Sequence, residues 1–405
     1  MRGPRSLLLV LITVACDRGP SREPAQAQVE TLPSGTRVVT SPVPTGWSDT
    51  AGAWTLVEEQ RYGGADGAAD ELGEPRSMAV DGAGRLYVFD AKPPRIKVFN
   101  RDGTLLRTIG RDGAGPGEFR MAFIAARGGS LVVHDPIIAR TSVFDTSGTY
   151  QRGWTTFCCY WSDIAIDTAQ RITVPAWIPD SVPGPGRGTP YVRYTMSGTT
   201  VDTFWVLRRS EERSWMFSSK GADGKQRMSM SMRIPWSPAV EHTLHPFGGV
   251  VRGYTGEYRL VYAPHGVDSA LVMVRPWTPV PITTEARRAR QESLIKSAAQ
   301  NVGEDAARAV AQLDDIPSTE PAFSRIYTDE AGHTWVRQLG ANDSTRATLD
   351  VFDPTGAWLG AVTIPHRVPE YGGLLITSAA VYSQVEDDDG RPVIVRLGIR
   401  RPVSR

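Results

Sequence analysis

Short apolar runs alternate with turn residues along most of this chain, and one version of the pattern occurs five times. Each copy has a run of β-branched or aromatic residues, a tight turn that ends in glycine, and a second run. The turn glycines of the five copies are Gly103, Gly148, Gly198, Gly266 and Gly356. Such runs predict short strands joined as hairpins. Hairpins that recur at a regular interval predict a repeat architecture.

The spacing of the turn glycines indicates the size of one repeat. Gly148 follows Gly103 after 45 residues, and Gly198 follows after 50 more. This period suits a four-stranded blade of a β-propeller. In the first repeat we expect strands over 76–80, 85–89, 95–99 and 105–109, in that order.

Two of the intervals are too long for one blade and predict insertions. The interval before Gly266 contains residues 209–235, where Met and Ser alternate as in an inserted β-hairpin. The interval after Gly266 contains residues 283–314, where apolar residues recur at helical spacing and Gly303 divides the segment in two. We therefore expect an inserted hairpin and a short helical insertion.

The last repeat, near residues 374–399, shows only three strands. The segment 54–62 lies ahead of the first repeat and is strand-like, so we expect it to supply the missing strand and close the ring. Closure hides sheet edges that would otherwise invite aggregation. The prediction is an all-β protein in which residues 54–401 form one six-bladed β-propeller with the two insertions.

The segment 74–90 resembles the NHL repeat, and so does 115–119 at the approach to the second blade. The region 54–401 as a whole resembles six-bladed propellers of the NHL type that occur as exported bacterial lipoproteins. This resemblance implies a platform that binds proteins or RNA, since only a minority of such propellers are lyases or hydrolases.

The N-terminus predicts export. Residues 1–15 have a basic start and a short apolar core, as in a signal peptide. The pair Ala15-Cys16 resembles the lipobox of bacterial lipoproteins, in which Cys16 becomes the lipidated first residue; an ordinary secretory peptide is the alternative. We expect a protein of the bacterial cell envelope, anchored on the periplasmic or cell-surface side.

Residues 16–53 are rich in Pro, Ser, Thr, Ala and Gln and contain few large apolar side chains. Such a composition does not bury enough surface to fold, so we expect a disordered tether whose removal leaves stability unchanged.

Lys and Arg number 45 against 44 Asp and Glu, and no basic stripe is present. This balance argues against nucleic-acid binding, which needs clustered cations.

Two adjacent cysteines, Cys158 and Cys159, lie between the second and third blades. In an oxidising compartment they would form a strained vicinal disulfide, and a rigid loop or two buried thiols are the alternatives. Aromatic residues accompany them: Trp154, Tyr160, Trp161 and Trp177. These rings would stack on a sugar or peptide ligand, or would fill the wedge between blades.

Four histidines fall near one end of the predicted channel: His134, His242, His245 and His366. Three neutral imidazoles around an open position would hold a catalytic divalent metal such as Zn²⁺, whereas unrelated surface and turn histidines are the simpler interpretation.

Asp90 with Arg95, and Asp135 with Arg140, repeat one spacing in two blades. They would form a ring of ligand contacts or brace each hairpin, and repetition favours the brace.

No motif of a nucleophile elbow, metalloprotease or phosphate loop is present in the sequence. The leading hypothesis is therefore a monomeric, membrane-tethered binding or scaffold module without a cofactor, whose ligand is a protein, peptide or carbohydrate. The alternative is a metal-dependent lyase or hydrolase with its site at the mouth of the channel. In a further hypothesis, the helices of residues 283–313 dock a partner.

Overall fold

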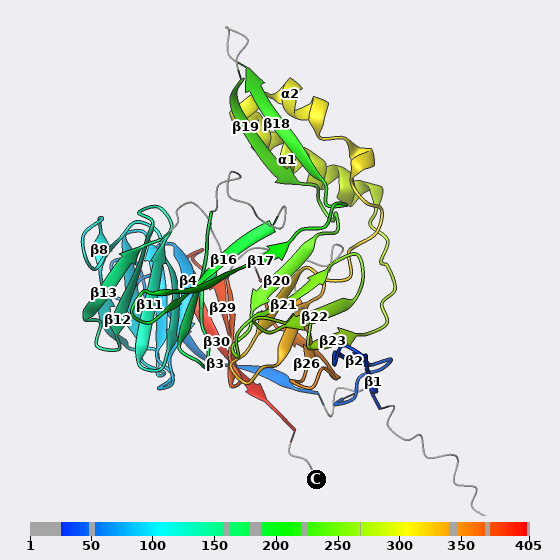
Figure 1. Ribbon diagram of the computed structural model, residues 1–405. Helices are drawn as coiled ribbons and strands as arrows, with labels where there is room; N and C mark the ends of the chain where they lie inside the picture. Colours follow the sequence, from blue (N-terminus) through cyan, green and yellow to red (C-terminus); the bar gives the residue numbers. More distant parts are fainter. Residues whose placement is uncertain are drawn as a thin grey trace, which may run out of the picture.

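The computed structural model describes residues 26–47, 53–156, 163–177, 188–220, 226–267, 269–339, 347–368 and 373–402. Six antiparallel blades, each with at least four strands, form the bulk of the molecule (Figure 1). The predicted all-β, six-bladed propeller is confirmed.

The first three blades follow chain order from the inner to the outer strand. Blade one contains β4 (Pro75–Val80), β5 (Leu86–Ala91), β6 (Pro94–Phe99) and β7 (Leu105–Ile109). Blade two contains β10 (Phe123–Arg127), β11 (Ser130–Asp135), β12 (Arg140–Asp145) and β13 (Tyr150–Thr155). Blade three contains β14 (Ala165–Ile166), β15 (Arg171–Pro175), β16 (Gly188–Thr195) and β17 (Thr200–Leu207). The short parallel pair β8 (Arg111–Asp112) and β9 (Glu118–Phe119) links blades one and two.

The last three blades draw strands from both ends of the chain. Blade four contains β20 (Val240–Leu244), β21 (Val250–Tyr254), β22 (Arg259–Ala263) and β23 (Leu271–Val274), followed by β2 (Arg37–Thr40) and β1 (Gln28–Thr31). Blade five contains β24 (Arg325–Thr328), β25 (Thr334–Arg337), β26 (Ala347–Phe352) and β27 (Trp358–Ile364). Blade six contains β28 (Leu374–Ile376), β29 (Ala380–Glu386), β30 (Pro392–Arg400) and β3 (Thr55–Tyr62).

The five turn glycines of the sequence repeat join the third strand to the fourth in blades one to five. Their φ angles lie between 75° and 94°, in the left-handed region that favours glycine. In blades one, two, three and five the pairing of the third and fourth strands has a β-bulge next to this turn. The repeated turn geometry is therefore the physical origin of the sequence repeat.

The hydrophobic core lies between neighbouring blades. Between blades one and two, the ring centroids of Phe89 and Phe119 are 6.5 Å apart, and those of Phe119 and Phe144 are 5.7 Å apart. All three side chains are buried. Each blade thus covers its apolar faces only with the help of both neighbours.

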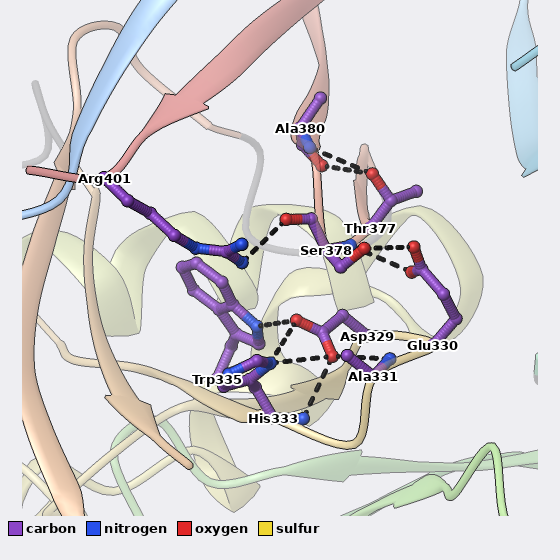
Figure 2. Close-up of polar contacts among 9 residues, drawn as sticks. All are labelled: Asp329, Glu330, Ala331, His333, Trp335, Thr377, Ser378, Ala380 and Arg401. Atoms are coloured by element: carbon purple, nitrogen blue, oxygen red, sulfur yellow. Dashed lines mark hydrogen bonds and ion pairs between the residues drawn. The ribbon is translucent and has the colours of Figure 1, made fainter. Parts of the chain in front are cut away.

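Ring closure follows the sequence prediction. β3 pairs antiparallel with β30 and becomes the outer strand of blade six. Figure 2 shows the junction between blades five and six, where Glu330 accepts hydrogen bonds from the backbone N–H and the hydroxyl of Ser378, at 2.9 and 2.5 Å. The Arg401 guanidinium donates to the Ser378 carbonyl at 2.8 Å. The turn between β28 and β29 is thereby joined both to blade five and to the end of the chain.

The expectation of a disordered tether over residues 16–53 is wrong for residues 28–47, which we call the N-terminal strap. β2 pairs in parallel with the outer strand of blade four, β23, and β1 pairs with β2. Val39 is buried in the strap, with 1% of its surface exposed. Composition misled because the strap is held mainly by backbone hydrogen bonds, which need few apolar side chains.

The strap continues across blade five. The Trp47 backbone N–H donates to the Leu359 carbonyl at 2.9 Å, and its indole Nε1 donates to the Ala361 carbonyl at 3.1 Å. The Trp47 ring stacks on that of Trp54, with centroids 5.2 Å apart. Gly360 has a φ of 147°, and a Cβ there would come within 2.3 Å of the Trp47 indole. A glycine at this position is therefore required for the Trp47 ring to pack against β27.

The two predicted insertions form one body, which we call the insert module. β18 (Ser214–Lys220) and β19 (Gln226–Arg233) make the hairpin, and α1 (Thr284–Val302) and α2 (Glu304–Val310) pack against it, followed by the 3₁₀ turn Leu313–Asp315. Gly303 separates the helices as expected. Figure 1 shows the module standing out from the propeller. Within the described residues, no helix is both long and apolar enough to cross a membrane.

The strap makes a stability prediction that differs from that of a tether. Trp47→Ala should lower the free energy of unfolding by about 3–5 kcal/mol, because the buried ring and its hydrogen bond are lost. Trp177→Ala is the matched control, since Trp177 is 52% exposed. Urea unfolding curves of both variants measure the difference. Equal unfolding midpoints would show that the strap does not hold the ring.

Candidate functional site

The inner strands of all six blades surround the central channel. These strands are β4, β10, β14, β20, β24 and β28, and together they line a cavity of about 280 Å³. The connections from one blade to the next enter at the beginnings of these strands, on what we call the upper face. The turns to the second strands lie on the lower face.

A second cavity, of about 670 Å³, lies at the upper end of the channel, and we call it the mouth. Its walls come from the beginnings of the inner strands, from the end of β17 and from the base of the β18–β19 hairpin. Arg76, Asp163 and Arg325 border both cavities. The insert module therefore stands at the entrance to the channel.

Arginine is the main charged residue of the mouth. Five guanidinium groups and three carboxylates line it, and two of the arginines pair with acids outside the lining, Arg76 with Glu74 and Arg213 with Asp315. The arginines are Arg76, Arg208, Arg213, Arg233 and Arg325, and the acidic residues are Asp163, Glu212 and Glu241. Because surrounding protein lowers the local dielectric, these charges act more strongly than on an open surface. The mouth suits a ligand that carries negative charge where one of these guanidinium groups has no carboxylate partner.

Ion pairs hold part of this lining in place. The Arg213 guanidinium lies 2.5 Å from a carboxylate oxygen of Asp315, which belongs to the helical insertion. Arg233 pairs with Glu241 at 2.6 Å. Arg208 is exposed and forms no ion pair with any residue that the structure describes. Its donors are therefore available to a ligand.

Two of the acidic residues have distinct environments. Asp163 is solvent-exposed at the border of the two cavities, where the surrounding protein partly desolvates its carboxyl and raises its pKa, while the positive charge of Arg325 acts in the opposite direction. Glu212 Oε1 accepts hydrogen bonds from the backbone N–H groups of Arg209 and Val240, at 3.1 and 3.0 Å. This carboxylate ties the start of the hairpin to the inner strand of blade four.

Among the candidate histidines, His242 lines the mouth. Its Nε2 lies 2.8 Å from the hydroxyl oxygen of Tyr191. Burial, with a smaller effect of the Arg252 charge, lowers the pKa of His242 to about 4. His242 is therefore neutral at neutral pH and presents a polar, uncharged ring to the cavity.

The other three candidate histidines lie elsewhere. His134 is buried inside blade two, with Nδ1 3.1 Å from the Thr141 hydroxyl. His245 follows β20 towards the lower face and packs on Tyr262, with ring centroids 4.1 Å apart. His366 lies in the connection from blade five to blade six. In the described ranges, no three His, Cys, Asp or Glu side chains come close enough to hold a metal ion.

The aromatic candidates are divided in a similar way. Trp154 packs on Tyr194 between blades two and three, with centroids 5.6 Å apart, and so fills an interblade wedge. Trp177 is exposed after the second strand of blade three. Four predicted site residues lie outside the described residues: Cys158, Cys159, Tyr160 and Trp161.

Both acids of the repeated Asp–Arg spacing brace the scaffold, and so does Arg140, whereas the Arg95 Nε is buried without a hydrogen-bond partner among the described residues. Asp90 accepts hydrogen bonds from the backbone N–H groups of Gly73 and Glu74, at 3.0 and 2.7 Å. Asp135 accepts in the same way from Arg120 at 2.6 Å. Arg140 donates to backbone carbonyls, including that of Gly115 at 2.6 Å. Each acid therefore fixes the connection that enters its own blade. This role agrees with the expected brace and not with a ring of ligand contacts.

Sequence reasoning missed the arginines of the mouth. A signal was present, because Arg76 is the second residue of the inner strand of blade one and Arg325 is the first residue of the inner strand of blade five. An alignment of the blades on their turn glycines would have placed both guanidinium groups at the upper end of the channel. Arg208, Arg213 and Arg233 reach the mouth only through the insertion, whose position the repeat does not define.

Known structures with a similar fold include three bacterial proteins. An exported-protein candidate from Bacteroides fragilis is 10% identical, with a TM-score of 0.47 over 90% of this chain and 100% of its own. A member of the DUF4221 family from Bacteroides vulgatus is 11% identical, with a TM-score of 0.46 over 87% and 100%. Virginiamycin B lyase from Staphylococcus aureus is 11% identical, with a TM-score of 0.40 over 85% and 99%. The sequence matches no protein-family model and no curated protein.

The buried histidines predict a pH dependence of stability. Burial lowers the pKa of His134 from its ordinary value of 6.5 to about 4. Between these values the unfolded chain binds a proton that the native protein does not, so stability is full above the unfolded pKa and falls as pH drops towards 4. His134 alone would contribute up to about 3 kcal/mol.

His134→Phe should flatten this dependence, because the substituted side chain does not titrate. Urea unfolding at neutral pH and at about pH 5 measures the difference. The variant loses the contact with Thr141 at every pH, so its change in slope, and not its absolute stability, is the test. A variant with the same pH slope as the parent protein would contradict the assignment.

Proposed function

We propose that this protein is a binding module of the bacterial cell envelope, and that the mouth of the propeller is its ligand site. The observation that supports this most strongly is a cavity of about 670 Å³ whose lining is rich in arginine and includes Arg208, which forms no ion pair with a described residue. Its volume falls within the range of small-molecule and peptide sites. The lining is polar, which favours a ligand with one or more carboxylates or other anionic groups.

The scaffold is suited to binding because the site residues come from separate, rigid elements. Arg76 and Arg325 are the second and first residues of inner strands in different blades, and Arg208 follows the outer strand of blade three. Interblade packing fixes these strands, so the backbone positions of the three arginines are set before a ligand arrives. Preorganisation of this kind reduces the ordering cost of binding. This arrangement is consistent with a binding platform of the NHL type.

The alternative of a metal-dependent lyase or hydrolase needs several of the candidate histidines at one place. The structure has His242 at the mouth, His134 inside blade two and His245 near the lower face. Among the described side chains, this distribution offers no three-ligand set for a metal. The mouth with its arginines is therefore the better-supported site.

Binding of anionic probes tests the proposed site. Triglutamate should bind the full-length protein and trilysine should not, in isothermal titration calorimetry at low salt. The double substitution Arg76→Glu/Arg208→Glu should weaken triglutamate binding by at least about tenfold, because charged hydrogen bonds are lost and repulsion is introduced. Arg152→Glu, on the exposed outer strand of blade two, is the control. Binding that is unchanged by the double substitution would place the site elsewhere.

We also propose that Cys16 is lipidated and anchors the protein in the membrane. The sequence of residues 1–16 supports this, and the strap makes the anchor short. Since the chain is already paired on blade four from Gln28, the segment 17–27 alone separates the lipid from the propeller. Fully extended, such a segment spans at most about 40 Å. The outer edge of blade four would therefore lie close to the membrane surface.

Cys16→Ser should release the protein into the soluble fraction. The acyl chains would supply the apolar area that holds the protein to the bilayer, at about 0.8 kcal/mol for each buried CH₂. Fractionation after a salt wash, with detection by immunoblot, measures the distribution of the variant and of the parent protein. Continued membrane association of the variant would show that a different anchor acts.

A further inference from the structure

The β18–β19 hairpin is held firmly on one face. Trp215 and Phe217 of β18 are buried against the helices, with 3% and 0% of their surfaces exposed. The Trp215 indole donates to Asp315 at 3.0 Å, beside the Arg213–Asp315 ion pair. Both helices lie against β18. The hairpin is therefore a fixed sheet of two strands in which the helices lie against β18, and β19 carries one of the two outer edges.

The outer edge of β19 has no strand partner among the residues that the structure describes. The sheet order is β18–β19 and ends there. The backbone of 226–233 forms no other hydrogen bond to the described backbone. Alternate N–H and C=O groups along this edge are consequently available. An open edge of this kind is a template for a further strand.

The side chains of β19 alternate in character. Met228, Met230 and Met232 point to the helix side, opposite Ser219, Phe217 and Trp215 of the neighbouring strand. Met228 is 41% exposed, and the other two methionines are only partly buried. Flexible, polarizable methionines adapt to varied apolar partners. The opposite side of β19 carries Ser229 and Ser231, so an added strand would meet apolar and polar positions in alternation.

The edge leads into the mouth. β19 runs from Gln226 towards Arg233, and Ser231 and Arg233 line the mouth. A strand that pairs antiparallel with β19 would begin at the mouth and extend away from it. Its first residues would lie in the mouth that Arg208 lines, and the Arg208 guanidinium forms no ion pair with a described residue. Charge complementarity therefore selects an acidic residue at the beginning of the strand.

We infer that the ligand of the mouth is an extended peptide, which adds as a third strand to the edge of β19. Its acidic N-terminal residue enters the mouth, and its apolar side chains at alternate positions cover the methionines of β19. This inference rests on the proposed function of the mouth, and it adds the class of ligand and the way in which the ligand binds.

Synthetic peptides test the inference on the full-length protein. The probe is acetyl-Glu-Thr-Val-Thr-Val-Thr-amide with a fluorescent label, and binding is followed by fluorescence anisotropy. Replacing Glu by Gln in the probe should weaken binding about tenfold or more. Arg208→Glu in the protein should have a similar effect, and Arg152→Glu should have none. The reversed sequence, with Glu last, should bind more weakly because an antiparallel strand would carry its charge away from the mouth.

N-methylation of the probe distinguishes strand addition from other modes of binding. An added strand pairs only every second amide with the edge of β19. N-methylation of one alternate set of amides should therefore weaken binding at least about tenfold, and methylation of the other set should leave it nearly unchanged. Equal effects of the two sets would overturn the inference.

Other outcomes also decide. If triglutamate binds through Arg208 but the extended probe does not, the inference fails and the proposed function stands. If neither probe binds, both fail. If the protein forms dimers in analytical ultracentrifugation that the probe does not dissociate, a second copy of this chain occupies the edge, and the inference is wrong.

Discussion

The pairing of β3 with β30 is the constraint on which the rest of the structure depends. Each blade buries its apolar faces against two neighbours, so a ring with one open blade would expose two of these faces at once. The strand that precedes blade one completes blade six, and closure joins chain segments more than 300 residues apart in sequence. The strap extends the same principle to the outside of two further blades. β2 adds a strand beyond β23 in blade four, and Trp47 forms hydrogen bonds with β27 at the outer edge of blade five.

Closure also explains where a site is able to form. The insert module arises from two successive connections, from blade three to blade four and from blade four to blade five, and both connections lie on the upper face. Packing of the helices on β18 joins the two insertions, and Glu212 fastens the hairpin to β20. Because the ring fixes blades four and five relative to each other, the base of the hairpin has a defined position over the channel. The arginines of the mouth are brought together in this way from four separate segments.

The sequence was sufficient to predict the scaffold because the scaffold repeats. The left-handed turn glycines, such as Gly103 and Gly356, must recur wherever the third strand of a blade turns into the fourth. The strap does not repeat, and backbone pairing with β23 leaves little trace in its composition. Its one large buried ring, Trp47, looked like an isolated aromatic residue in a polar segment.

The candidate site was harder to predict, for a related reason. A blade alignment defines whether a histidine lies near the upper or lower face, but it does not define which neighbouring blade its side chain meets. His134 consequently lies inside a blade although its strand ends near the upper face. The arginines were missed because a single charged residue at the start of a strand usually faces solvent. Only the assembled ring shows that Arg76 and Arg325 border one cavity.

Hydrogen exchange of the native protein, followed by mass spectrometry, tests the closure of the ring by β3 most directly. If β3 closes blade six, its amides that pair with β30 will exchange as slowly as those of β23 and β29, because all of them open only when the ring opens. Rapid exchange of β3, at the rate of an unprotected chain and with β29 still protected, would contradict this account.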